Sequence, residues 1–322
     1  MQFESSQLAT CFEQVLIAAP RASRSYLYRS LRAHQKVFVS VLIFFVAPAS
    51  VAQLNWEGQT GGLVTPFAYT TSSSSHGLGH PEVAFHYMNA GQVLGNEFQV
   101  SVNLGFLGVG EIGFTRAFNS QGSSSQLSPL FGNGFNIAHI KFRILPENLH
   151  QRKFVPEIAT GAVVRTQVRR VTEVLEHENT TCTDFYLVGT KTIEQWHGIP
   201  ILLNLGIKLT NASLMGIAAN SPNWTFRSFG AAGLKIKGPV HSSLWLGMEF
   251  AQQPRQLKEV PGPFFPTTAT IPTTLAYLVR VHPGGELPFN LDFGLMQLAG
   301  RIGPALDLQA RHAFTMGVSY RF

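Results

Sequence analysis

The feature that most constrains the fold is a strict alternation of side-chain character, clearest over residues 313–322. There Phe314, Met316, Val318, Tyr320 and Phe322 alternate with the small or polar residues Thr315, Gly317, Ser319 and Arg321. Successive side chains of a β-strand point to opposite faces, so a period of two gives a strand one apolar and one polar face. The end of the chain is therefore predicted to be a strand with two chemically different sides.

The same alternation recurs along the chain and predicts twelve strands. They are expected at 82–89, 98–106, 109–118, 135–145, 154–168, 183–191, 203–210, 224–237, 244–251, 275–282, 289–296 and 313–322. Their connections alternate in length, with tight ones near 107–108 and 283–286 and long ones at 119–134 and 252–272. Outer-membrane barrels have short periplasmic turns and long external loops. An even number of strands returns the chain to the side from which it started.

Composition excludes several other classes of protein. Only 13% of the 322 residues are charged and 45% are hydrophobic, which is not the composition of a disordered chain. The longest clean apolar run, Val37–Val46, is half the length that a membrane-spanning helix needs, about 20 residues. No basic run lies outside the first 36 residues, so nucleic acid is not expected as a partner.

A secreted β-sandwich would also show alternation, and it is the main alternative fold. The predicted strands reach ten residues or more, whereas sandwich strands usually have five or six. Their polar faces are rich in Gly, Ser, Asn and single charges, as expected of a confined lumen. The sequence therefore favours an all-β fold, a transmembrane antiparallel up-and-down β-barrel of about twelve strands spanning residues 82–322.

The N-terminal segment is predicted to be an export signal. Lys36 precedes the apolar run, and the small residues Ser50–Ala52 follow it, which is the order of a secretory signal peptide. We expect residues 1–52 to be signal peptide and leader, removed after about Ala52. Residues 53–81 then precede the barrel, either in the periplasm or as a plug in the lumen. Cys182 is the one cysteine after the predicted cleavage site, which excludes an internal disulfide in the exported chain.

The ending, with alternating apolar residues and a terminal Phe, resembles the C-terminal signature of Gram-negative outer-membrane barrels. The resemblance implies that the chain lies in outer-membrane lipid and that the barrel-assembly machinery reads Val318, Tyr320 and Phe322. A shorter stretch, residues 61–68 (Gly-Gly-Leu-Val-Thr-Pro-Phe-Ala), resembles YjbH-type outer-membrane proteins linked to exopolysaccharide export. No function is assigned from that stretch.

If the apolar faces meet lipid, most charged side chains face the lumen or its rim. The basic ones are Lys141, Arg143, Arg165, Lys208, Arg227, Lys235, Lys237, Arg280 and Arg321; the acidic ones are Glu111, Glu157, Glu249 and Asp292. A basic lumen favours anions. The first hypothesis is therefore a narrow channel for small anionic solutes. The alternative is that paired charges fill the barrel, giving a non-conducting scaffold or an envelope or exopolysaccharide-assembly component.

Chemical motifs are weak in this sequence. Residues 108–113 fit G-x-G-x-x-G but lie in a predicted turn that enters a strand, where a dinucleotide site needs a helix. Two clusters carry side chains that can bind metals, but neither has the spacing of a known metal site: His76, His80 and Glu82 form one, and Glu176, His177, Glu178 and Cys182 form the other. A lipid-acting barrel enzyme would need an outward Ser and His pair, and none is evident. No metal, cofactor or catalytic residue is predicted, and the chain is not expected to be an enzyme.

Overall fold

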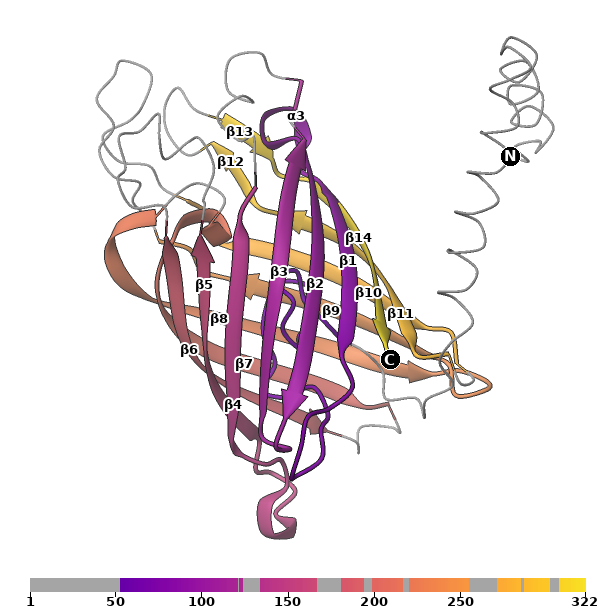
Figure 1. The fold of residues 1–322 in the computed structure, drawn as a ribbon. Helices are drawn as coiled ribbons and strands as arrows, with labels where there is room; N and C mark the ends of the chain where they lie inside the picture. Colours follow the sequence, from indigo (N-terminus) through magenta and orange to yellow (C-terminus); the bar gives the residue numbers. More distant parts are fainter. Residues whose placement is uncertain are drawn as a thin grey trace, which may run out of the picture. The chain divides into compact units, whose positions relative to one another are not determined.

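The computed structural model describes residues 53–120, 122–123, 134–166, 181–193, 199–216, 220–254, 271–284, 287–301 and 307–322 (Figure 1). The chain divides into two compact units, 1–47 and 48–322, and every described residue belongs to the second. The predicted signal peptide and leader, 1–52, lie outside the described residues.

Twelve antiparallel strands close into one barrel, which confirms the predicted fold class. In chain order they are β1 (Glu82–Asn89), β2 (Asn96–Phe106), β3 (Gly110–Ser120), β4 (Asn136–Leu145), β5 (Glu157–Thr166), β6 (Cys182–Ile193), β7 (Ile201–Ala212), β8 (Asn220–Lys237), β9 (Ser243–Ala251), β10 (Thr274–His282), β11 (Phe289–Gln297) and β14 (Ala313–Arg321). Each pairs with its neighbour in the chain, and β14 closes the ring by pairing with both β11 and β1.

Two strands depart from their predicted bounds for identifiable reasons. β5 begins at Glu157 rather than at 154, because Pro156 has no N–H to donate and Val155 N instead bonds to Arg152 O in a turn. β8 begins four residues earlier than expected, because the pairing with β7 shifts register and resumes at Asn220, opposite Ala212.

The two faces of the wall differ as the alternation predicts. Ile207, Phe226 and Leu295 are more than half exposed on the outside of the barrel. Their chain neighbours Lys208 and Arg227 face inward, the first buried and the second half-buried. The apolar rows do not face a second sheet, so the sandwich alternative is excluded. Among the described helices, none combines the length and apolar character that crossing a membrane requires.

The connections define two different ends of the barrel. At one, here called the short-turn end, lie the turns after β2, β4, β8 and β10, together with Phe322 (Figure 1). Here Gly108 has a φ of 66° and Leu107 one of 52°, a tight turn directly into β3. The G-x-G-x-x-G stretch is therefore a hairpin turn, as predicted.

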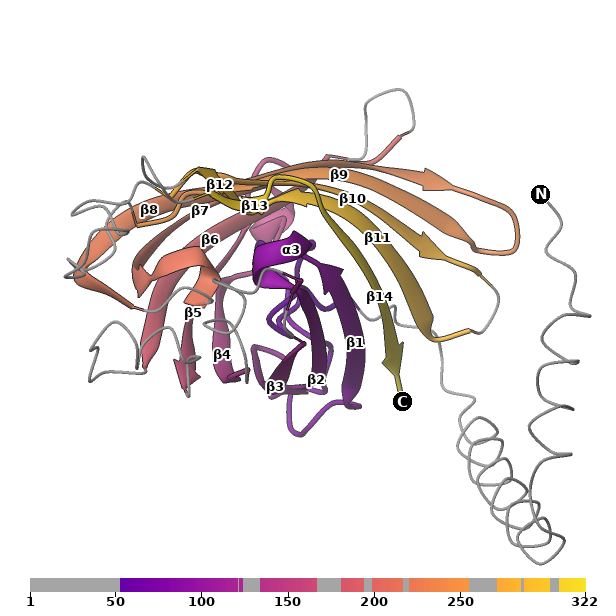
Figure 2. The ribbon, with the colours of Figure 1, turned by 90° about the horizontal axis from the view of Figure 1, so that it is seen from above.

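The opposite, long-loop end carries elements that the sequence pattern did not predict. A short helix, α3 (Gly91–Leu94), and a separate hairpin of β12 (Ala299–Arg301) and β13 (Asp307–Ala310) lie together there (Figure 2). Val93 and Leu94 of α3 are buried, as is Leu308 of β13. Two single turns of 3₁₀ helix also lie in connections. Leu149–Gln151 is in the β4–β5 turn at the short-turn end, and Ser213–Gly216 follows β7 at the long-loop end.

The predicted assembly signal lies on the strand that closes the ring. Val318 is exposed on the outer face opposite Phe85 of β1. The Tyr320 and Phe322 rings meet edge to face with centroids 5.0 Å apart, and Phe322 N donates to Pro81 O. Recognition of these residues by the assembly machinery stays a prediction.

Candidate functional site: a plugged lumen and a basic vestibule

Residues 53–72, here called the plug, run inside the barrel (Figures 1 and 2). The plug side chains of Trp56, Leu63 and Phe67 are each 1% exposed. Backbone groups throughout the segment bond to inward-facing side chains of the wall, as described below. In the structure, residues 53–72 are therefore enclosed by the wall of the barrel.

Glu249 of β9 is the strongest single anchor of the plug. Its carboxylate accepts hydrogen bonds from the backbone N–H groups of Leu63, Val64 (3.0 Å) and Thr65 (2.7 Å), and from the Thr65 hydroxyl (2.7 Å). Consecutive N–H groups that converge on one anion form a backbone nest. A wall carboxylate thus occupies a nest made by residues 63–65.

A buried ion pair holds a second point of the plug. Lys141 Nζ lies 2.8 Å from Glu111 Oε1, and both side chains are fully buried. Lys141 also donates to the carbonyls of Thr60 (2.9 Å) and Tyr69 (3.0 Å). Glu111 accepts from the Thr60 and Thr71 N–H groups and from the Thr60 hydroxyl. The pair therefore ties together two parts of the plug that are nine residues apart.

A third anchor joins the plug to β5 and β6. Arg165 Nε donates to Glu57 Oε1 at 2.7 Å, and Arg165 Nη2 donates to Asp184 Oδ2 at 3.1 Å. Lys208 of β7 also contacts Asp184, at 3.2 Å. Asp184 was missing from the predicted inward acids, although it alternates with Phe185 and could have been found. Nothing in the local pattern identified Glu57, because the plug has no strand periodicity.

We expect Arg165→Met to destabilise the protein strongly. Removing one partner leaves Glu57 buried without a cation, and breaking a buried pair in this way costs about 3–5 kcal/mol. Unfolding in urea, followed by gel mobility of unheated samples, should show a clearly lower midpoint. Arg311→Met is the matched control, since its pair with Asp307 is exposed and such pairs contribute under about 1 kcal/mol. Equal midpoints for the two variants would contradict the anchoring role.

The predicted excess of free basic charge in the lumen is not confirmed. Arg280 pairs with Asp292, and Arg321 with Glu82, besides the pairs of Lys141, Arg165 and Lys208. The other predicted basic residues lack a carboxylate within 4 Å among the described residues: Arg143 donates to Gly108 O, Arg227 donates to Gln253 O, and Lys235 and Lys237 are exposed. The predicted acid Glu157 is buried near the short-turn end, where it accepts a long hydrogen bond from Glu147 N.

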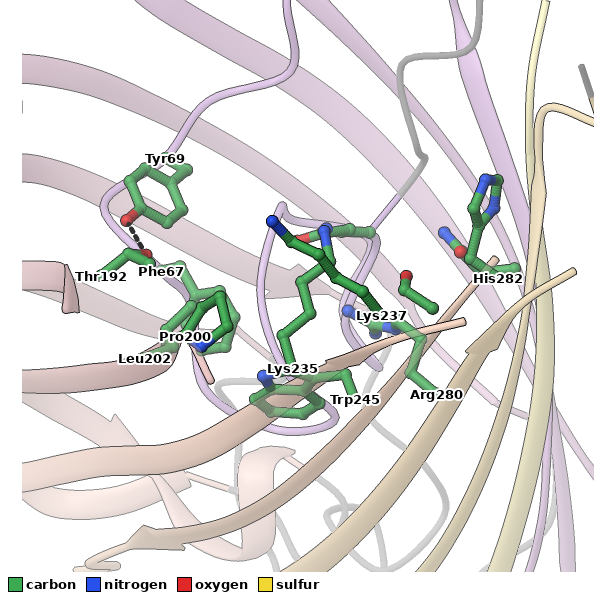
Figure 3. A pocket seen from close by; sticks show the side chains of 13 residues that line it. Phe67, Tyr69, Thr192, Pro200, Leu202, Lys235, Lys237, Trp245, Arg280 and His282 are labelled. Carbon is green, nitrogen blue, oxygen red and sulfur yellow. Dashed lines mark hydrogen bonds between the residues drawn. The ribbon is translucent and has the colours of Figure 1, made fainter. Parts of the chain in front are cut away.

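A cavity of about 400 Å³, here called the vestibule, lies at the short-turn end between plug and wall (Figure 3). It is lined by Gln53, Phe67, Tyr69, Thr192, Pro200, Leu202, Lys235, Lys237, Ser243, Trp245, Arg280, His282 and Asn290. Four of these are basic and none is a carboxylate. Of the four, the sequence pattern placed Lys235, Lys237 and Arg280 in the lumen or at its rim.

Strand register explains why the basic residues meet. Lys235 of β8 and Arg280 of β10 are both opposite Trp245 of β9. One level nearer the end, Lys237 and His282 are both opposite Ser243. The two levels are about 7 Å apart along the strands, and β8 and β10 are about 10 Å apart across β9. Four basic side chains therefore share one small area of the wall.

Trp245 fits between these basic residues because its neighbours are glycines. A Cβ added at Gly233 or at Gly247 would collide with the Trp245 ring. The ring also meets Phe67 of the plug edge to face, with centroids 6.0 Å apart, and the Arg280 guanidinium lies 6.0 Å from its centroid. Glycine within a strand often marks such a close approach.

Tyr69 forms the plug side of the vestibule. Its hydroxyl donates to Glu147 Oε2 at 2.9 Å and lies 2.8 Å from Thr192 Oγ1 (Figure 3). Burial raises the pKa of the Tyr69 phenol above its usual range, so the group stays protonated at neutral pH. The plug therefore contributes a neutral hydroxyl and aromatic surface to the vestibule, and no negative charge.

Toward the long-loop end, the space beside the plug is much smaller. A cavity of about 20 Å³ is bordered by Glu57, Arg165 and Asp184. That volume holds roughly one water molecule. Within the part of the chain that the structure describes, the vestibule borders the plug at Gln53, Phe67 and Tyr69.

Comparison with known proteins assigns the chain to a family. Residues 49–270 match the family model described as "Protein of unknown function (DUF3034)". The chain belongs to the DUF3034 family. The match includes the plug and β1 to β9, so Glu249 and both lysines of the vestibule lie within it. No curated protein matches the sequence.

Solved structures similar to this DUF3034 chain are membrane barrels. The KdgM porin has a TM-score of 0.43 and 6% identity, covering 75% of this chain and 99% of that one. The NanC porin has a TM-score of 0.43 and 9% identity, and the match covers 75% of this chain and 100% of that one. The COG4313 outer membrane channel from Pseudomonas putida F1 has a TM-score of 0.40 and 13% identity, and the match covers 80% of this chain and 100% of that one.

The stretch that resembles YjbH-type proteins, residues 61–68, forms the central part of the plug, including the nest that Glu249 fills. Its likeness to those proteins stays a prediction.

Proposed function

We propose that this DUF3034 protein is an outer-membrane barrel that passes small anionic solutes and is closed, in the present structure, by its plug. The observation that carries the proposal is the vestibule, whose lining includes four basic side chains and no carboxylate. The apolar outer face supports a place in lipid, and the predicted export signal supports the bacterial outer membrane.

Charge at the vestibule supports a preference for anions. Lys235 and Lys237 are exposed, and no described carboxylate lies within 4 Å of either ammonium group. A cleft of one charge sign with low-dielectric walls raises the local concentration of oppositely charged solutes. Arg280 contributes less, because Asp292 accepts from it at 2.7 and 2.8 Å. The two lysines would therefore set the selectivity.

Passage requires the plug to move. The anchors at Glu249, Lys141 and Arg165 fill the lumen with bonded polar groups, and the cavity beside Glu57 and Arg165 has a volume of about 20 Å³. The same anchors favour a second candidate, a non-conducting scaffold or envelope-assembly component in which the plug never leaves. The third alternative, a lipid-acting enzyme, gains no support, since the described outward positions are mostly apolar.

Planar-bilayer recording of the full chain tests the proposal. With a potassium chloride gradient, we expect discrete current steps whose reversal potential indicates chloride preference. The double variant Lys235→Glu and Lys237→Glu should move the reversal potential toward potassium. A matched control is Arg152→Glu with Lys153→Glu, which changes two exposed charges in the β4–β5 turn at the same end. Absence of current steps in both the natural chain and a Glu249→Leu variant, which lacks the anchor of residues 63–65, would favour the scaffold.

A further inference from the structure

We propose that the vestibule is a binding site for a small anion with two or more negative charges, and that its occupation favours the seated plug. The inference deepens the proposed function, since it assigns a regulatory ligand to the same plugged barrel. It concerns the closed form of the protein, so it can be tested without any current.

The size and chemistry of the vestibule define the ligand class. A volume of about 400 Å³ admits a molecule the size of a diphosphate or a small organic polyacid. Lys235 and Lys237 project from one face of β8, and Figure 3 shows both side chains reaching into the cavity. Two ammonium groups on flexible stems favour an anion that offers two charged groups, because one monovalent ion cannot engage both at full strength. Asn290 and Thr192 add neutral hydrogen-bonding groups.

The site is made jointly by plug and wall. Gln53, Phe67 and Tyr69 come from the plug, whereas the basic residues come from β8 and β10. Arg280 joins the two parts, since it donates to the plug carbonyls of Gly61 (3.0 Å) and Gly62 (3.1 Å) while it borders the cavity. When the plug leaves, three lining residues leave with it.

Because plug and wall residues line the site together, a bound anion is expected to favour the closed barrel. A ligand shifts a two-state equilibrium toward the state to which it binds more tightly. The complete site exists only with the plug seated, so a bound anion stabilises the closed barrel. It also lowers the repulsion among Lys235, Lys237 and Arg280, which face the same space.

The position of the site fixes the side from which the ligand enters. The vestibule lies at the short-turn end, between plug and wall, so we expect its ligand to enter and leave there. In an outer-membrane barrel that end faces the periplasm. A polyanion accumulating in the periplasm would therefore close the barrel, which gives the channel negative feedback from the solutes that it delivers.

Hydrogen exchange of the full chain in detergent, with pyrophosphate as the probe, tests the inference. At a concentration one hundred times its Kd, pyrophosphate should slow exchange of the amides of residues 63–72 about a hundredfold, by linkage with a state that alone binds it. Sodium chloride of equal ionic strength should have little effect. The double variant Lys235→Gln and Lys237→Gln should lose the protection, while Arg152→Gln with Lys153→Gln, in the β4–β5 turn at the same end, should keep it.

Two outcomes would overturn the inference. In one, pyrophosphate binds with equal affinity to both double variants, which would show nonspecific attraction to a basic end. In the other, it binds in the vestibule, as shown by loss with the Lys235 and Lys237 variant, but leaves plug exchange unchanged. If pyrophosphate slows amide exchange in the plug but the chain never conducts, the proposed channel function is wrong and the anion-binding site is still supported.

Discussion

Replacing Glu249 by leucine is expected to unseat the plug and open the barrel. The Glu249 carboxylate accepts hydrogen bonds from three backbone N–H groups and one hydroxyl of residues 63–65, and all four donors are buried. Each buried donor left without an acceptor costs about 1–3 kcal/mol. Because leucine accepts nothing, the four donors would be satisfied only when the plug moves into water. The loss is large enough to change which state is populated, since about 1.4 kcal/mol corresponds to a factor of ten.

Two measurements should report this change. Amides of residues 63–72 should exchange at least a hundredfold faster in Glu249→Leu, and the variant should show frequent open current steps where the natural chain is mostly closed. Glu249→Gln, which keeps one acceptor oxygen, should lie between the two. Asp307→Asn is the control, because its partner Arg311 is exposed on the β12–β13 hairpin. Exchange in Glu249→Leu at the natural rate would mean that the nest does not hold the plug.

The second large effect is expected on the outer face. Ile207 lies near the middle of β7, 53% exposed, opposite Leu187 on β6. An arginine at this height would meet the centre of the bilayer, where it destabilises a barrel by about 2–4 kcal/mol. We therefore expect Ile207→Arg to fold poorly into lipid vesicles and to unfold at a lower urea concentration.

Gel mobility of unheated samples, which separates closed barrels from unfolded chains, measures the folded fraction. Val240→Arg is the matched control, since Val240 is 72% exposed but lies in the β8–β9 turn. The control should fold as the natural chain does. If both variants fold equally well, the apolar rows do not face lipid, and the proposed location is wrong.

Local pattern was sufficient for the wall of the barrel. The alternation at residues 289–296 predicted an apolar outer row and a polar inner row, and β11 has both, with Phe293 exposed and Asp292 buried. The same logic placed Lys235 and Arg280 inside. It failed before Pro156, where Phe154 and Val155 were included in the predicted strand but lie outside β5. It also left the β12–β13 hairpin as a loop, because its strands of three and four residues are too short to show a period.

Residues 53–72 illustrate what pattern could not provide. Thr65 and Glu249 are 184 positions apart, and the segment between them contributes eight complete strands and most of a ninth. The twelve two-faced strands could be predicted from the alternation alone, because the geometry of each residue fixes the face of the strand to which its side chain points. The inward acids predicted in this way still lacked Asp184. The pairing of the inward charges with one another and with the plug could not be predicted in this way, and neither could the basic vestibule between plug and wall. Both depend on closure of the barrel, which brings groups that are distant in the sequence together.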